Sequence, residues 1–327
     1  MNQAALKPSL AAPLFMLFVT GVAYGLTYSL AGVSVRGGIP FTAYVFWLGV
    51  IAGAVMFVLA LLFRKPPRVT RAHLKCYAVT GASGFAIPYI IVAVVVGNGV
   101  PSGILSMIIA LAPMLTYLGA VIFRLERAWW VKFVGLLVGI AGIVLIVAPD
   151  ASLPSRDLVK WILIALIVPL GYATTTIAAA IMRPPAMDSL SFSAGYFLAP
   201  VPILFVAMIA TGEFWAFGGE FGDAEWALVL SGLVQGLGIY LFLELVMLKG
   251  PVFFTTVNFI TPVTGILWGM AFLNERLSFW VLIALVPLFL GLFFVMLDIL
   301  RHVRHFFFVM FAIFFCFCSH QYQFKNF

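Results

Sequence analysis

Stretches of about twenty apolar residues fill almost the whole chain, and short segments that carry charge, glycine or proline separate them. An α-helix needs roughly 20 apolar residues to cross the ~30 Å hydrocarbon core of a bilayer. The stretches that meet this length cover residues 11–34, 40–63, 75–96, 101–123, 129–148, 159–182, 190–211, 224–248, 251–273 and 279–298. We therefore expect an all-α polytopic membrane protein with ten transmembrane helices.

The composition agrees with a protein whose main solvent is lipid. Of the 327 residues, 64% are hydrophobic and 9% are charged. A soluble domain carries about 25% charged residues, and a soluble chain this apolar would expose large hydrophobic patches. The net charge of +7 does not indicate nucleic-acid binding, because the basic residues lie in short segments between apolar stretches, where they orient a membrane protein.

The basic residues are divided unequally between alternate connections. If the N-terminus is cytoplasmic, 14 of the 18 lysines and arginines fall on the cytoplasmic side, and the other side keeps only Arg36, Arg156, Lys160 and Arg276. Cytoplasmic connections are enriched in Lys and Arg. We therefore expect a cytoplasmic N-terminus and an integral protein of the bacterial inner (plasma) membrane.

An internal repeat relates the two halves of the chain. A shift of 149 residues places Pro113 on Pro262 and the Glu-Arg pair at 126–127 on the pair at 275–276. Because each half contains five apolar stretches, an odd number, the second half must enter the membrane in the opposite orientation. Inverted repeats of this kind build secondary transporters, with the substrate site near the bilayer midplane.

The boundaries of the repeats follow from the same shift. We predict a first five-helix repeat over residues 1–150, a second, inverted repeat over 151–300, and an aromatic C-terminal tail over 301–327. The apolar part of the tail, residues 305–318, is short for a membrane span and is more typical of an interfacial segment.

Two segments carry the repeat most clearly. They read LAPMLTYLGAVIFRLERAWWVKFVGLLVGIAGIVLIV at 111–147 and ITPVTGILWGMAFLNERLSFWVLIALVPLFLGLFFVM at 260–296. Each holds a proline inside a helix, a Glu-Arg pair about thirteen residues later, and a further apolar helix with glycine. This paired pattern resembles the signature of the drug/metabolite transporter superfamily, in its EamA-type branch. The resemblance covers about 11–298 and implies export or exchange of small metabolites through a central cavity.

Small and polar residues form matching stripes on the fourth and ninth predicted helices. They are Ser102, Ser106, Ile109, Pro113, Thr116 and Ala120 on the fourth helix, and Thr255, Asn258, Pro262, Gly265 and Gly269 on the ninth. Steps of three or four residues keep each stripe on one helix face. A proline frees the carbonyl one turn earlier, which is tolerated at membrane depth only beside protein or a watery cavity. We expect the stripes to line the substrate cavity, with both prolines as flexing points; tight packing through small residues is the alternative.

Other candidates lie on the first, sixth and eighth helices. Glu244 is an acid well inside an apolar stretch, and intramembrane ionisable residues are functional candidates. It lies ~12 Å along the helix from the centre of its stretch, so it either serves proton coupling or substrate amine binding, or reaches the interface and pairs with Lys249. The candidate substrate-binding residues are Tyr28, Ser106, Thr116, Gln235, Tyr240, Glu244, Thr255 and Asn258. Tyr24, Thr27, Tyr172 and Thr174 to Thr176 are further candidates. For the threonines, hydroxyl bonding to their own helix is the commoner explanation.

We expect neither an enzyme nor a cofactor or metal site. The chain has no Gly-x-x-x-x-Gly-Lys-Ser/Thr loop, no His-Glu-x-x-His and no Gly-x-Ser-x-Gly, the motifs of ATP hydrolysis, zinc proteolysis and serine hydrolysis. The predicted partners are a small-molecule substrate, the lipid bilayer and, for coupling, a proton or a second solute. A non-transporting structural membrane subunit is the alternative function, and a membrane-embedded enzyme is the less favoured one.

Overall fold

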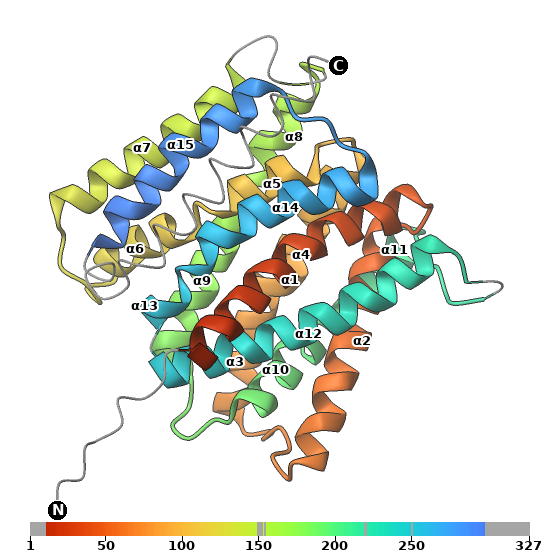
Figure 1. Ribbon diagram of the computed structural model, residues 1–327. Helices are drawn as coiled ribbons and strands as arrows, with labels where there is room; N and C mark the ends of the chain where they lie inside the picture. The colour runs from red at the N-terminus through yellow and green to blue at the C-terminus, as the bar shows by residue number, and fades with distance from the viewer. Residues whose placement is uncertain (1–10, 149–152, 154, 219–220, 250, 298–327) are drawn as a thin grey trace, which may run out of the picture.

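The computed structural model describes residues 11–148, 153, 155–218, 221–249 and 251–297 (Figure 1). These residues form helices joined by short turns, and no strand occurs among them. The predicted tail over 301–327, with its apolar segment 305–318, lies outside the described residues.

The helices follow the predicted apolar stretches. In chain order they are α1 (Ala11–Arg36), α2 (Phe41–Leu62), α3 (Arg71–Gly81), a π-helical turn (Ala82–Ala86), α4 (Ile87–Gly97), α5 (Ser102–Ile109), α6 (Ala112–Ile122), α7 (Trp130–Val147), α8 (Leu158–Ala165), α9 (Ile167–Met182), α10 (Ser189–Leu198), α11 (Val201–Ala210), α12 (Asp223–Lys249), α13 (Pro251–Phe254), α14 (Val257–Leu273) and α15 (Phe279–Val295). Within the described chain, 8 continuous helical stretches are long and apolar enough to cross a membrane, and α14 and α15 are shorter apolar helices. The number of ten spanning helices therefore stays a prediction.

Proline explains several of the interruptions. Pro113 lies in the first turn of α6, directly after the break that separates α5 from α6. A missing N–H costs little at this position, because the first N–H groups of a helix have no intrahelical partner. Pro262 behaves differently: it lies inside the continuous helix α14, and the break in this stretch comes earlier, between α13 and α14. The two prolines that the repeat superimposes thus have different effects on their helices.

The helices of the two halves pack in equivalent pairs. In one set, α1 lies against α12 and α14; in the other, α9 lies against α4 and α6. The helix α2 packs on α10, and α7 runs beside α15 at one edge of the molecule (Figure 1). Exchanging the first half with the second converts the α1 pairs into the α9 pairs, and it maps the α2–α10 and α7–α15 pairs onto themselves. This exchange is what a twofold relation between two five-helix repeats requires.

The turns that end α6 and α14 also repeat in the backbone. The Glu126 N–H donates to Ala120 O and the Glu275 N–H donates to Gly269 O, both at 3.2 Å. These donors and acceptors coincide under the 149-residue shift. A residue in the left-handed region also lies shortly before each glutamate, Arg124 two residues before Glu126 and Asn274 directly before Glu275, and this is a common way to end a helix. The predicted internal repeat is therefore present in the hydrogen bonds as well as in the sequence.

Glycine allows α7 and α15 to approach at the level of their backbones. A Cβ at Gly135 would lie 2.7 Å from Gly291 O, and a Cβ at Gly142 would lie 3.0 Å from Ala284 O. The predicted packing glycines on other helices also lie in close contacts, here with side chains: a Cβ at Gly21 would lie 2.7 Å from the Ile260 side chain, and a Cβ at Gly232 would lie 2.6 Å from the Ile51 side chain. The small-residue contacts that hold membrane helices together therefore account for these glycines.

The contact between α7 and α15 predicts the effect of enlarging Gly291. A Gly291→Leu side chain would enter the backbone of Gly135 and Gly139, and overpacking a close contact costs about 1–3 kcal/mol. We expect a lower melting midpoint in detergent, measured by thermal unfolding of the purified protein. Gly218→Leu is the control, since a Cβ there would have its nearest neighbour at 4.0 Å. Equal midpoints for the two variants would show that the contact is looser than the structure indicates.

Candidate functional site

A cavity of about 1420 Å³ lies between the two halves. Its walls come mainly from α1, α6, α9, α12 and α14, with further residues from α4, α7 and α10. The lining continues into the turns after α6 and α9 and to the end of α12. Charged residues in this outer part are Glu126, Arg127, Lys132, Arg183 and Lys249. Because these turns are exposed to solvent, the cavity opens at this end, which we call the mouth.

Five tyrosines from both halves form the inner part of the lining. They are Tyr24, Tyr28, Tyr89, Tyr172 and Tyr196. The Tyr28 and Tyr172 hydroxyl groups face each other across the boundary between the repeats. The Tyr24 hydroxyl donates to Gly238 O at 3.1 Å. Tyrosine offers an apolar ring and a polar tip, so this cluster presents aromatic surface together with hydroxyl groups.

Part of the tyrosine cluster belongs to a short segment that is repeated between the two halves. Residues 23–28 read Ala-Tyr-Gly-Leu-Thr-Tyr, and residues 171–176 read Gly-Tyr-Ala-Thr-Thr-Thr. Tyr24 and Tyr172 are equivalent in this alignment. Tyr89 and Tyr196 were not singled out from the sequence, because apolar neighbours surround both and nothing in the pattern shows which helix face meets the cavity.

Gln235 is the polar side chain of α12 that faces this cluster. It lines the cavity and is only 4% exposed, and its Oε1 has no hydrogen-bond partner among the described residues. A buried amide oxygen without a partner costs free energy. A ligand that donates a hydrogen bond at this point would recover that cost, which makes Gln235 a candidate binding group.

The predicted stripes divide between two roles. The half of each stripe nearer the mouth lines the cavity, with Ile109, Pro113, Thr116 and Ala120 on one side and Thr255 and Asn258 on the other. The Thr116 hydroxyl bonds to its own helix, at Ala112 O. Ile109 and Asn258, equivalent in the repeat, each precede a proline by four residues, so each has a carbonyl without its helical partner.

The other half of each stripe is packed shut. Ser106 is fully buried and its hydroxyl donates to Gly103 O at 2.7 Å and to Pro262 O at 3.3 Å. A Cβ at Gly269 would meet Ser102 Oγ at 2.6 Å. Ser106 and Pro262 therefore lie in a helix seam and are not among the residues that line the cavity. The packing alternative describes this half of the stripes.

Two other candidates on α12 lie outside the lining. Tyr240 and Glu244 are partly buried and face the turn after α2, where Lys65 Nζ pairs with Asp188 at 2.8 Å. The hydrogen bond to the Asp188 carboxylate raises the pKa of Lys65, and Glu244 adds to the same effect. Among the sixth-helix candidates, Thr174 and Thr176 bond to their own helix, as the commoner explanation predicts.

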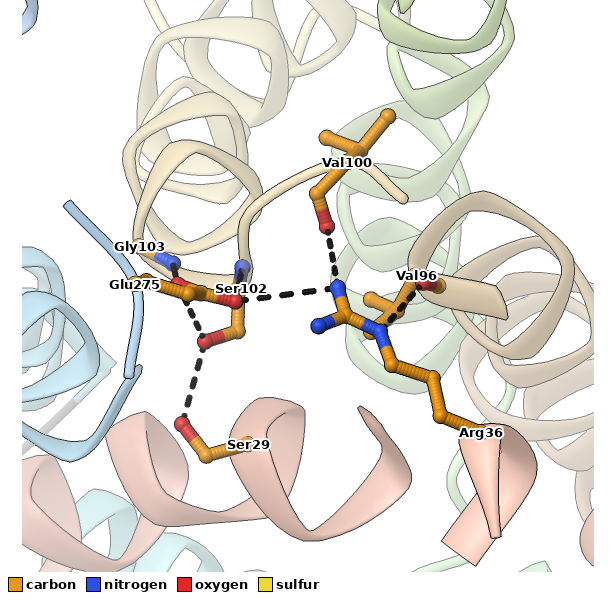
Figure 2. A network of polar contacts seen from close by, with 7 residues as sticks. All are labelled: Ser29, Arg36, Val96, Val100, Ser102, Gly103 and Glu275. Carbon is orange, nitrogen blue, oxygen red and sulfur yellow. Dashed lines mark hydrogen bonds and ion pairs between the residues drawn. The ribbon is translucent and has the colours of Figure 1, made fainter. Parts of the chain in front are cut away.

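The end opposite the mouth is closed by a polar network around Glu275 (Figure 2). Its carboxylate accepts hydrogen bonds from the Ser102 N–H at 2.8 Å, the Ser102 hydroxyl at 3.0 Å and the Gly103 N–H at 3.3 Å. The Ser29 hydroxyl lies 3.1 Å from that of Ser102. The Glu275 side chain is 6% exposed. A carboxylate that bonds the first N–H groups of α5 caps that helix, where the helix dipole favours negative charge.

Arg36 completes the network from the end of α1. Its Nη2 lies 3.8 Å from Glu275 Oε1 and donates to Val100 O at 3.4 Å, and its Nε–H donates to Val96 O at 3.2 Å. A second acid, Glu213, accepts from the N–H and hydroxyl of Thr42 at 2.8 and 2.7 Å, at the start of α2. Acids from the second half thus hold the helix starts of the first half at this end.

Comparison with known proteins assigns the chain to a family. The sequence model of the EamA-like transporter family matches residues 11–148 and matches again at 159–297. The chain belongs to the EamA-like transporter family. It is therefore an integral membrane protein of a transporter family, and the resemblance to EamA-type drug/metabolite transporters is confirmed. The two matches coincide with the two halves that the helix pairs relate.

A solved crystal structure shares the fold of this EamA-family protein. It has a TM-score of 0.61 and 19% sequence identity, and the alignment covers 90% of this chain and 99% of the other. At this identity the likeness concerns the fold alone. No curated protein matches the sequence closely enough to count as a relative.

The division of the stripes predicts which positions water reaches. In a background without the native cysteines Cys76, Cys316 and Cys318, we expect Asn258→Cys in detergent-solubilised protein to react with a small water-soluble maleimide at least about ten times faster than Ser106→Cys. The reason is that Asn258 lines the cavity whereas Ser106 is buried in the seam. Labelling rates followed by mass spectrometry measure the difference, and equal rates would contradict this placement.

Proposed function

We propose that this EamA-family protein is a secondary transporter that exports or exchanges small metabolites by alternating access. The observation that supports this most directly is a cavity between two related halves, open at the mouth and closed at the other end by the Glu275 network. Inverted-repeat transporters bind substrate at the repeat interface and rock one half against the other. The structure then corresponds to one of the two states.

The lining suggests the class of substrate. Among the described lining residues, four basic side chains stand at the mouth against one acid, Glu126, and the inner part holds tyrosines and Gln235. A cationic amine would be repelled at the mouth, whereas a neutral, zwitterionic or anionic solute would not. Within the expected range of amino acids, amines and drug-like solutes, we therefore favour small amphipathic solutes without net positive charge.

The mouth is the proposed cytoplasmic end. Arg127, Lys132, Arg183 and Lys249 at the mouth belong to the set of basic residues that predicts a cytoplasmic N-terminus. With that orientation the structure is inward-open, ready to load an internal metabolite for export across a bacterial plasma membrane. A non-transporting structural subunit remains the second candidate, but a water-accessible cavity with an unpartnered Gln235 oxygen favours a binding protein over a scaffold.

The proposed function predicts flux through the purified protein. In liposomes, we expect uptake of at least one labelled amphipathic solute, and faster uptake when the same unlabelled solute is trapped inside, because exchange needs no return of an empty carrier. Gln235→Leu, which removes the cavity amide at similar size, should lower uptake about tenfold with an unchanged melting midpoint. Folded protein that moves no solute of any charge class under any imposed gradient would exclude the proposal.

Proton coupling through Glu244 is tested separately. The Glu244 side chain is not among the lining residues, and it faces Lys65 at the mouth side of α12. We therefore expect Glu244→Gln to transport with an unchanged pH dependence, and coupling to a second solute in place of a proton. A pH profile of uptake that flattens in Glu244→Gln, but not in Glu225→Gln on the same helix, would show that Glu244 carries the coupling.

A further inference from the structure

The closed end is held by an ion pair between two neighbouring helix ends. Arg36 is the last residue of α1, and Glu275 follows the end of α14. These two helices pack against each other, so that the pair joins the first half to the second. Figure 2 shows both side chains reaching the start of α5, where Glu275 bonds Ser102.

The mouth contains the counterpart of Glu275 and an arginine next to the counterpart of Arg36. Glu126 is equivalent to Glu275 under the 149-residue shift and follows the end of α6. Arg183 follows the end of α9 and lies one residue from the counterpart of Arg36 in the register that aligns Tyr24 with Tyr172. The helices α6 and α9 pack against each other, as α14 and α1 do at the closed end.

These counterparts have other partners while the mouth is open. Both line the cavity. Glu126 pairs with Lys132 at 3.3 Å with a side chain that is 43% exposed. Arg183 donates to Met187 O at 2.7 Å and its guanidinium lies 5.4 Å from the centre of the Phe192 ring. Partial burial lowers the pKa of Arg183, since desolvation disfavours its charge, with Asp188 and Glu244 acting in the opposite direction.

We propose that Glu126 and Arg183 form the ion pair that closes the mouth when the opposite end opens. The proposal rests on the alternating access proposed above. In an inverted repeat the two halves exchange conformations between the two states, so that the contact made by Arg36 and Glu275 at one end is transferred to their counterparts at the other. In that state Glu126 leaves Lys132, and Arg183 exchanges its carbonyl partner for a carboxylate.

The two closures differ in one respect that the sequence defines. Pro251 stands where the first half has Ser102, and proline has no N–H to donate. The mouth closure therefore lacks both hydrogen bonds that Ser102 gives to Glu275, one from its N–H and one from its hydroxyl, and the charge of Arg183 carries a larger share of the closure. Neutralising this arginine should thus affect the closed mouth more than neutralising Arg36 affects the closed opposite end.

Charge reversal tests the pair. The reporter is the maleimide labelling rate of Ser106→Cys. Ser106 lies in the helix seam beyond the cavity, toward the closed end, and this seam must part when that end opens and the mouth closes. We expect Glu126→Arg and Arg183→Glu each to slow labelling about fivefold, the lower range for a coupling between two states, and the double reversal to restore at least half of the rate. Glu126→Arg with Lys132→Glu is the matched control, which rebuilds the pair of the open mouth and should not restore the rate.

The outcomes separate this proposal from the proposed function. Two results overturn the ion pair and leave transport standing, provided that liposomes show solute exchange. In one, neither single reversal changes the labelling rate; in the other, the Lys132→Glu control restores that rate as well as the double reversal does. Labelling that follows the expected pattern without flux of any solute supports the pair and removes transport. If a reversal variant does not fold, Glu126→Gln, Arg183→Gln and their combination replace it: a paired contact makes the double variant no slower than the singles, whereas additive slowing contradicts the pair.

Discussion

Within a bilayer every backbone N–H and C=O needs a partner inside the protein, because lipid supplies none. This requirement explains where the chain is interrupted and what stands at each interruption. The break between α5 and α6 places Pro113 in a first turn, where its missing N–H has no cost. The Glu275 carboxylate caps the start of α5, because it accepts hydrogen bonds from the first N–H groups of that helix. The side chains that complete the backbone bonding at helix ends are also the ones that join the two halves.

The same requirement makes the two ends chemically unequal, although the repeat makes them geometrically alike. At the closed end, Glu275 and Glu213 each bond a backbone N–H and a hydroxyl of the other half. At the mouth, Pro251 has neither the N–H nor the hydroxyl that Ser102 donates in the other repeat. If the mouth closes as proposed, more hydrogen bonds still favour closure at the Glu275 end, so the proposed transporter is expected to rest with its mouth open, as it is in the structure.

The sequence predicts the fold better than the site, for a physical reason. Apolar length and the 149-residue shift predict the helix positions and the relation between the two halves, since both depend on properties that every residue of a stretch contributes. A site depends on which face of a helix turns inward, and an apolar helix in lipid has no polar face to indicate it. Thr116, Gln235, Thr255, Asn258 and Tyr28, which line the cavity, stand out in the sequence because they are polar. Ser106 is equally polar but lies in the seam, and Tyr89 and Tyr196 carry no local signal at all.

The stripes on α5–α6 and α14 show why one pattern can serve two purposes. Small residues permit close approach, and they also leave space when a neighbouring helix withdraws. Near Ser106 and Gly265 the helices touch and no space remains; near Pro113 and Asn258 the same kind of surface borders the cavity. A rocking motion that opens one region and closes the other needs surfaces that suit both conditions. Small residues along the whole stripe, rather than at one end of it, are what a moving contact requires and what a fixed scaffold does not.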